Sequence, residues 1–451
     1  MQFDYFSIPQ LLPAVFWLII ILVIAQSRKG KYSFEEGKYY MINVYTKLFF
    51  SLAFVLFFLI VYGGGDTIAY MDGTVCLNNL FLDNPGLYFE QMLSTPTDNS
   101  ISLYFNARTG YPPGWIYREP EGFFVCKITS ILSLITFKSY IAITFLMSFF
   151  VASASYRVYV LIRKMKIVRD GYLAIGFLFL PSVNFWCTGV SKDSIVYIGV
   201  LTMFYHGFLL LTKDHKRRLR SILIFTAMAL LVFHIRSIVL FVTVAALILA
   251  FSSALANRMS SGRRTVIFVR LVIIVGGFVA LSQGLSSSSE AEFLEENSIF
   301  QEAAITQRDF ATNVTYGENR YTIGTIEYTP TGLILAAPFA ILAGIFRPFI
   351  WEALSPSLLF NGLESMLLIY LVIYFFAKGA LAKLRLIQNH EILMFALSFV
   401  LIMGFVTGLT SGLFGVLVRL RAPLLPFAII LLSILPPKND EEEAIQSEIP
   451  A

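Results

Sequence analysis

Long apolar runs with charged residues at their ends are the feature that most limits what this chain can fold into. Hydrophobic residues make up 57% of the sequence, and charged residues only 14%. A water-soluble protein of 451 residues exposes far more charge than this, so lipid must solvate most of the surface. The sequence therefore predicts an all-α polytopic membrane protein.

Short basic loops between the apolar runs predict the orientation, because such loops stay in the cytoplasm. They are residues 28–38, 163–169, 213–220, 258–264 and 378–385. Alternation from these loops places the N-terminus outside, the C-terminus in the cytoplasm, and about eleven spanning helices between them. The predicted spans are 8–26, 42–63, 139–162, 171–187, 194–212, 219–234, 237–255, 265–283, 355–377, 391–410 and 421–436.

Two further apolar segments, residues 123–137 and 331–345, are shorter than the roughly 20 residues that a span needs. Counting either as a crossing would put a basic loop outside, so we predict two interfacial or re-entrant helices on the outer face. Residues 1–436 then form one integral membrane domain with large outer loops at 64–122 and 284–330. Residues 437–451 are predicted to be a disordered, acidic cytoplasmic tail.

Several classes of protein are disfavoured. The net charge of +5 comes from the cytoplasmic loops and does not indicate nucleic-acid binding. No Walker, GxSxG, HExxH or Rossmann motif is present, and the three cysteines have no metal-ligand spacing. Cys76 and Cys126 can pair in an oxidising compartment or remain free. The chain has no evident internal repeat, which disfavours the commonest transporter architectures.

The segment GGGDTIAYMDG holds the candidate catalytic residues, Asp66 and Asp72, directly after the second predicted span. If a helix resumes at Thr67, Asp66 is its N-cap and Asp72 lies on a nearby turn. A carboxylate here can act as a general base on a sugar hydroxyl. It can also hold a divalent cation, Mg²⁺ or Mn²⁺, against a phosphate. The simpler alternative is a plain helix cap.

Two further segments place ionisable residues where apolar runs meet. Lys192 and Asp193 close a predicted hairpin, with Lys192 a candidate phosphate ligand and Asp193 its support. Arg236 lies between two hydrophobic flanks and must find an anion, either a carboxylate or a lipid phosphate. The simpler alternatives are a snorkelling lysine and structural pairing. His234 is a supporting candidate, although taken alone it fits a satisfied core histidine better.

The C-terminal third adds FRPFIWEA and VRLRAPLLPF. Arg347 is a candidate headgroup ligand supported by Glu352, or the two simply pair with each other. Arg419 and Arg421, at the predicted outer start of the last span, can clamp a phosphate bidentately or anchor the helix to headgroups. Glu364 lies within a predicted span and needs a buried partner.

These groups share the predicted outer leaflet, and together they suggest one site. Lys192, Arg236, Arg347, Arg419 and Arg421 would surround a lipid-linked phosphate, with the attached sugar near Asp66 and Asp72. The cations would stabilise the departing phosphate, and a carboxylate would take the proton from the attacking hydroxyl.

The early acidic residue, the first outer loop with interfacial helices and the Arg-x-Arg-x-Pro of the last span resemble the GT-C class of polytopic glycosyltransferases. The segments LPSVNFWCTGVSKDSI, FRPFIWEA and LVRLRAPLLPF also resemble uncharacterised bacterial polytopic proteins of the surface-polysaccharide type. The resemblance implies a GT-C-like fold in the bacterial cytoplasmic membrane. It implies transfer of a sugar from a polyprenyl-phosphate-linked donor to a glycan, lipid or protein acceptor at the outer face, in surface glycan assembly.

The chain departs from the GT-C pattern in two respects. Asp66 is followed by Thr67 rather than by a second acid, and no sizeable soluble C-terminal domain is present. An O-antigen or exopolysaccharide polymerase, and a transporter or flippase of a lipid-linked anion, therefore remain alternatives.

Overall fold

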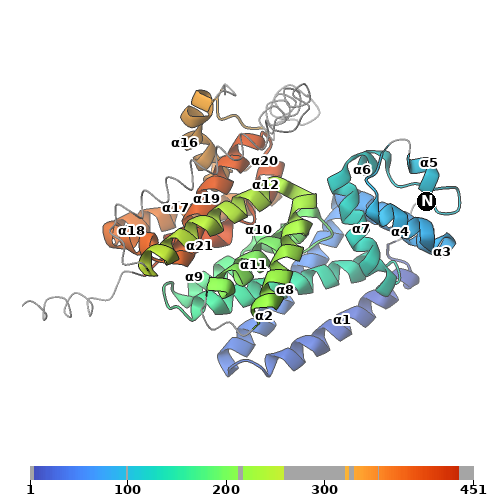
Figure 1. The fold of residues 1–451 in the computed structure, drawn as a ribbon, viewed down its shortest axis with the longest axis horizontal. Helices are drawn as coiled ribbons and strands as arrows, with labels where there is room; N and C mark the ends of the chain where they lie inside the picture. Colours follow the sequence, from blue (N-terminus) through green and yellow to red (C-terminus); the bar gives the residue numbers. More distant parts are fainter. Residues whose placement is uncertain are drawn as a thin grey trace, which may run out of the picture. The chain divides into compact units, whose positions relative to one another are not determined.

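The computed structural model describes residues 5–97, 100–211, 217–258, 320–324, 330–353 and 355–435, and most of these residues are helical (Figure 1). Two isolated β-bridges are the only β pairing among them. The all-α fold class is therefore confirmed. The helices, in chain order, are α1 (Ile8–Lys29), α2 (Phe34–Leu56), α3 (Asp66–Asp83), α4 (Pro85–Leu93), α5 (Ile101–Tyr104), α6 (Gly114–Arg118), α7 (Pro120–Ile135), α8 (Tyr140–Arg163), α9 (Asp170–Ala174), α10 (Pro181–Trp186), α11 (Lys192–Leu211), α12 (Arg218–Arg258), α16 (Pro330–Phe346), α17 (Pro356–Ala377), α18 (Ala380–Asn389), α19 (Glu391–Thr410), α20 (Phe414–Arg421) and α21 (Leu425–Leu432).

Seven helices in the described residues are long and apolar enough to cross a membrane, and α20 with α21 makes an eighth if that bent pair is one span. The protein is thus a helical polytopic membrane protein. The seven are α1, α2 with its π-helical end Phe57–Val61, α8, α11, α12, α17 and α19. The predicted span at 265–283, the tail 437–451 and most of the loop 284–330 lie outside the described residues.

The predicted count of about eleven spans is not reached in the described residues. The predicted spans 219–234 and 237–255 follow one another in α12, whose backbone leaves helical geometry at Arg236, with φ −154° and ψ 83°. The break therefore lies where the sequence predicts two apolar runs to meet.

The predicted span 171–187 is not one helix, because it is broken before Pro181 into α9, a π-helical segment (Ile175–Phe179) and α10. Proline has no N–H, so the carbonyl of Phe177 four residues earlier loses its helical donor. The ammonium of Lys47, fully buried on α2, lies 3.5 Å from that carbonyl and also bonds the side chain of Asn184. Asn184 in turn donates to the carbonyl of Leu178 at 3.1 Å. Side chains thus replace the missing backbone bonds, as a membrane interior requires.

The described residues belong to two compact units. The first comprises Met1–Tyr159 and Phe177–Leu240, and the second comprises Val160–Gly176 and Phe241–Ala451. The residues predicted to form one site are divided between them. Asp66, Asp72, Lys192, Asp193, His234 and Arg236 are in the first unit, and Arg347, Glu352, Arg419 and Arg421 are in the second.

In the first unit, the predicted outer loop 64–122 is largely helical and contains α3 to α6. The short apolar segment predicted at 123–137 is α7, which packs along α3. Buried hydroxyls of Thr74 and Thr129, 2.5 Å apart, join the two helices. Cys76 and Cys126 are buried free thiols, so the pairing that the sequence left open is not formed.

In the second unit, α16 corresponds to the short apolar segment predicted at 331–345, and it packs closely on α19. Gly404 and Gly408 are four residues apart on α19, a spacing that lets helix backbones approach in membranes. A Cβ on Gly408 would lie 1.9 Å from the carbonyl oxygen of Ala340 on α16. A Cβ on Gly344 would likewise lie 2.0 Å from the carbonyl oxygen of Gly404. This contact positions α16, whose C-terminal end leads to Arg347.

Candidate functional site

Asp66 and Asp72 both lie on α3, a continuous helix over Asp66–Asp83. The helix begins at Asp66 and its N-cap is Gly65, so the predicted cap at Asp66 is displaced by one residue. Gly65 has φ +97°, a conformation that favours glycine. Six residues of helix separate the two carboxylates by about 120° around the axis and about 9 Å along it. The two side chains therefore leave the helix in different directions, and the helix alone does not pair them.

Asp72 has its own partner, because the hydroxyl of Tyr5 donates to Asp72 Oδ1 at 3.3 Å. Burial raises the pKa of the Asp72 carboxyl above its usual range, and the Tyr5 hydrogen bond partly offsets this. A carboxylate with a raised pKa is a better general base than an ordinary aspartate. Among the described residues, no group of three or more His, Cys, Asp or Glu side chains could hold a metal ion.

Lys192, predicted as a phosphate ligand, is bound to carboxylates instead. It is the first residue of α11, and its ammonium pairs with Glu119 and lies 3.6 Å from Glu121. Both glutamates lie at the start of α7, where Pro120 occupies the first helical position. The side chain of Lys192 is only 10% exposed, whereas those of Glu119 and Glu121 are about half exposed. Burial raises the pKa of the Glu121 carboxyl, and Lys192 and Arg236 lower it.

Arg236 is paired in the same way. Its guanidinium lies 2.7 Å from Asp193 Oδ1, and the Asp193 side chain is fully buried. Arg236 is also the residue at which α12 breaks, so this ion pair joins the break to the first turn of α11. Arg236 therefore forms a structural ion pair, the simpler of the two alternatives.

His234 is exposed, which is contrary to the interpretation of it as a core histidine. Its ring stacks on Phe124 of α7 with a centroid distance of 4.9 Å, and its Nδ1 lies 2.8 Å from the carbonyl oxygen of Leu230. The His234 ring therefore packs against α7, the helix that carries Glu121.

These residues form one charge cluster in the first unit, with three carboxylates and two cations: Glu119, Glu121, Asp193, Lys192 and Arg236. Sequence reasoning missed the two glutamates. The signal was present, because Glu-Pro-Glu directly before an apolar helix is an N-terminal pattern in which acids are favoured. The cluster is slightly acidic overall, so it is less suited to a phosphate than Lys192 and Arg236 alone suggested.

In the second unit, Arg421 is fully buried and does not form a phosphate clamp with Arg419. Its guanidinium donates to the carbonyl of Arg347 at 2.6 Å, to Ser365 Oγ at 3.0 Å and to the carbonyl of Asn361 at 3.1 Å. The predicted clamp fails because both arginines lie inside α20, where residues two apart point about 200° from each other.

Arg421 is also a partner of Glu364, the acid predicted to need one inside a span. That carboxyl is 7% exposed on α17 and interacts electrostatically with Arg421. Arg421 thus ties α20 to α17 and to the backbone at the end of α16.

Arg347 forms an ion pair with Glu352, which is the simpler of the two arrangements that the sequence left open. The Arg347 Nε donates to Glu352 Oε1 at 2.9 Å, and Glu352 also accepts from the backbone N–H of Phe349 at 2.9 Å. The guanidinium lies over the rings of Tyr321, at 4.8 Å, and Phe414, at 5.8 Å. The ion pair is therefore held in a fixed position beside the end of α16.

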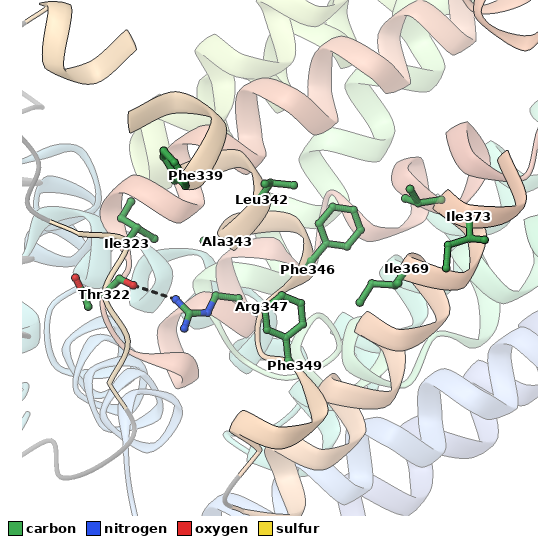
Figure 2. Close-up of a pocket in the computed structure, with 11 residues that line it drawn as sticks. Thr322, Ile323, Phe339, Leu342, Ala343, Phe346, Arg347, Phe349, Ile369 and Ile373 are labelled. Carbon is green, nitrogen blue, oxygen red and sulfur yellow. Dashed lines mark hydrogen bonds between the residues drawn. The ribbon is translucent and has the colours of Figure 1, made fainter. Parts of the chain in front are cut away.

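A cavity of about 540 Å³ opens beside this arginine, between α16, α17 and residues 322–323 (Figure 2). Its walls are almost entirely apolar, and Arg347 is the only ionisable residue among the described residues that line it. Figure 2 shows Arg347 reaching toward the carbonyl of Thr322, to which it donates at 3.1 Å. The lining residues are Thr322, Ile323, Phe339, Leu342, Ala343, Phe346, Arg347, Phe349, Ile369, Val372 and Ile373.

Sequence reasoning placed Arg347 at a lipid-headgroup site but did not predict this cavity. The lining side chains come from segments far apart in the chain, and apolar residues on spanning helices carry no signal that separates a cavity wall from a lipid-facing surface. Comparisons of the chain with protein-family models, with curated proteins and with solved structures find no match in any of the three.

Proposed function

We propose that the protein is a membrane glycosyltransferase, GT-C-like in its chemistry, that takes a sugar from a polyprenyl-phosphate-linked donor at the outer face of the bacterial cytoplasmic membrane. The observation that carries the proposal is the apolar cavity with Arg347 at its edge. A ligand for such a cavity has a long hydrocarbon part and an anionic group, and a polyprenyl phosphate has both.

The apolar walls would hold the isoprenoid chain, because they can make close van der Waals contact with it and present almost no polar group that binding would desolvate. Arg347 would hold the phosphate. Glu352 and Thr322 use three of the five N–H donors of the guanidinium, which leaves two for a ligand. The paired carboxylate of Glu352 balances the charge of the Arg347 guanidinium.

In the proposed reaction, an acceptor hydroxyl attacks the anomeric carbon of the donor sugar. The new C–O bond forms as the bond from that carbon to the phosphate oxygen breaks, and polyprenyl phosphate leaves. The hydroxyl proton passes to a general base.

The proposal is tested by filling the cavity. Purified protein in lipid nanodiscs is labelled with a photoreactive analogue of farnesyl phosphate. Leu342→Trp places an indole in the cavity, whereas Leu335→Trp, on the same helix and 70% exposed, does not line it. We expect the first substitution to lower affinity about tenfold or more, equal to about 1.4 kcal/mol, and the second to leave it unchanged. Equal labelling of the two variants would contradict the proposal.

The charge requirement is tested by competition. Unlabelled farnesyl phosphate should compete with the analogue better than farnesol, which lacks the phosphate. The double variant Arg347→Met with Glu352→Gln, which leaves no unpaired charge, should remove that preference while farnesol still binds. If the preference persists in the double variant, another residue holds the phosphate.

A further inference from the structure

An exposed tryptophan lies next to the cavity, on the turn that follows Arg347. Trp351 is 73% exposed and belongs to η5, a single 3-10 turn (Ile350–Glu352). Its ring stacks nearly parallel on that of Phe349, with centroids 4.8 Å apart and an interplanar angle of 16°. Phe349 itself lines the cavity, so the two rings extend the apolar wall outward from the lining.

The turn that carries Trp351 is held on two sides. Glu352, at its end, bonds both Arg347 and the backbone N–H of Phe349. On the other side, the turn packs on α17 at Gly362, where an added Cβ would lie 3.0 Å from the Cα of Ile350. The backbone that carries the indole is therefore held, and the indole stacks on Phe349, which together lower the entropy lost when a ligand stacks on it.

Tryptophan is also common at membrane surfaces, where it anchors helices among lipid headgroups. Two features favour a ligand here. One face of the indole is already covered by a ring of the cavity wall, and the ion pair of Arg347 and Glu352 lies on the same short segment. An aromatic face with a few fixed polar groups beside it is the usual composition of a small-molecule site.

We infer that Trp351 is the stacking platform for the pyranose ring of the lipid-linked donor. The inference rests on the proposed function and adds the position of the sugar to it. The C–H groups on one face of a pyranose carry partial positive charge, and the face of an indole carries partial negative charge, so the two stack. The isoprenoid chain would lie in the cavity, the phosphate at Arg347 and the sugar on Trp351.

The test uses the full chain in nanodiscs with Trp17, Trp115 and Trp186 changed to Phe, so that Trp351 is the only tryptophan and can be excited selectively at a wavelength that tyrosine does not absorb. Two probes are compared: farnesyl phosphate, and farnesyl phosphate that carries glucose. We expect the glucosylated lipid to change the fluorescence of Trp351 clearly more than the sugar-free lipid does.

Substitutions in the otherwise native chain give the second readout. Trp351→Ala should weaken binding of the glucosylated lipid about tenfold and leave binding of farnesyl phosphate unchanged, and Trp351→Phe should restore most of the loss.

If both lipids bind but Trp351→Ala affects them equally or not at all, the inference is wrong and the proposed function survives. If Trp351 is quenched by brominated lipids whether or not the sugar lipid is bound, it is a membrane anchor and the inference is also wrong. If neither probe binds, the proposed function fails together with the inference.

Discussion

At the scale of single residues, four of the five cations that the sequence selected as anion ligands have an acidic or backbone partner in the described residues. Lys192 and Arg236 bind carboxylates, and Arg421 binds backbone carbonyls and a serine. A cation out of water costs several kcal/mol unless it is paired, so partners of this kind are expected wherever a ligand does not supply them. Among these cations, Arg347 lines the apolar cavity between α16 and α17.

Arg421 and Arg419 lie two residues apart on α20, but Arg421 is fully buried and Arg419 only partly so. Arg421→Met removes a cationic neighbour of the buried Glu364 and the donors to the carbonyls of Arg347 and Asn361. We expect a loss of about 3–5 kcal/mol in the free energy of unfolding, because the central cation of a buried polar network is removed. Arg419→Met, on the partly exposed side of α20, should cost about 0–1 kcal/mol. Thermal unfolding of the purified variants in detergent measures both, and similar losses for the two would contradict the buried role of Arg421.

At the scale of elements, glycine decides how closely helices approach. The contact between α16 and α19 depends on Gly344, Gly404 and Gly408, and it positions the helix that forms one wall of the cavity. Small residues at such a spacing are needed because, in lipid, packing rather than the hydrophobic effect holds helices together.

Gly408→Ala should therefore destabilise the protein, since its Cβ would lie 1.9 Å from the backbone of Ala340. Overpacking of this kind costs about 1–3 kcal/mol. Gly415→Ala on α20 is the matched control, because a Cβ there meets no atom within 4 Å. That change should be neutral or stabilising by about 0.5–1 kcal/mol. The midpoints of thermal unfolding distinguish the two, and an unchanged midpoint in Gly408→Ala would show that the helices separate without cost.

At the scale of the whole molecule, the predicted orientation in the membrane can be tested by labelling. The three native cysteines are buried, so a cysteine introduced at an exposed position is the main target of a maleimide that cannot cross membranes. Arg108, in the predicted outer region, and Lys31, in a predicted cytoplasmic loop, are both exposed. Arg108→Cys should react in intact cells, and Lys31→Cys should react only after the membrane is permeabilised. The reverse pattern would invert the orientation, move α3 to α7 to the cytoplasmic side, and remove the basis for chemistry at the outer face.

Much of the fold was predictable from the sequence, because the need to bury backbone polar groups in lipid makes every long apolar run a helix. The bounds of α1, α8, α17 and α19 agree with the predicted spans to within about three residues, and the two short apolar segments are α7 and α16. The break at Arg236 also lies at a charged residue between two apolar runs. The predicted span 171–187 is broken at Pro181, where a proline in an apolar run favours a kink or an early helix end. The side chain that satisfies the freed carbonyl, Lys47, was not predictable because it is distant in the chain.

The tertiary structure alone decided which charged residues are satisfied and where space remains. A sequence shows that Arg421 is charged, but not that it donates to the carbonyls of Arg347 and Asn361. It shows that Asp66 and Asp72 are six residues apart, but not that their side chains leave α3 in different directions. The physical reason is that lipid selects residues by polarity, which can be read along the chain. Ion pairs and cavities instead depend on side chains brought together from distant segments, as Glu119 meets Lys192 and Thr322 meets Arg347.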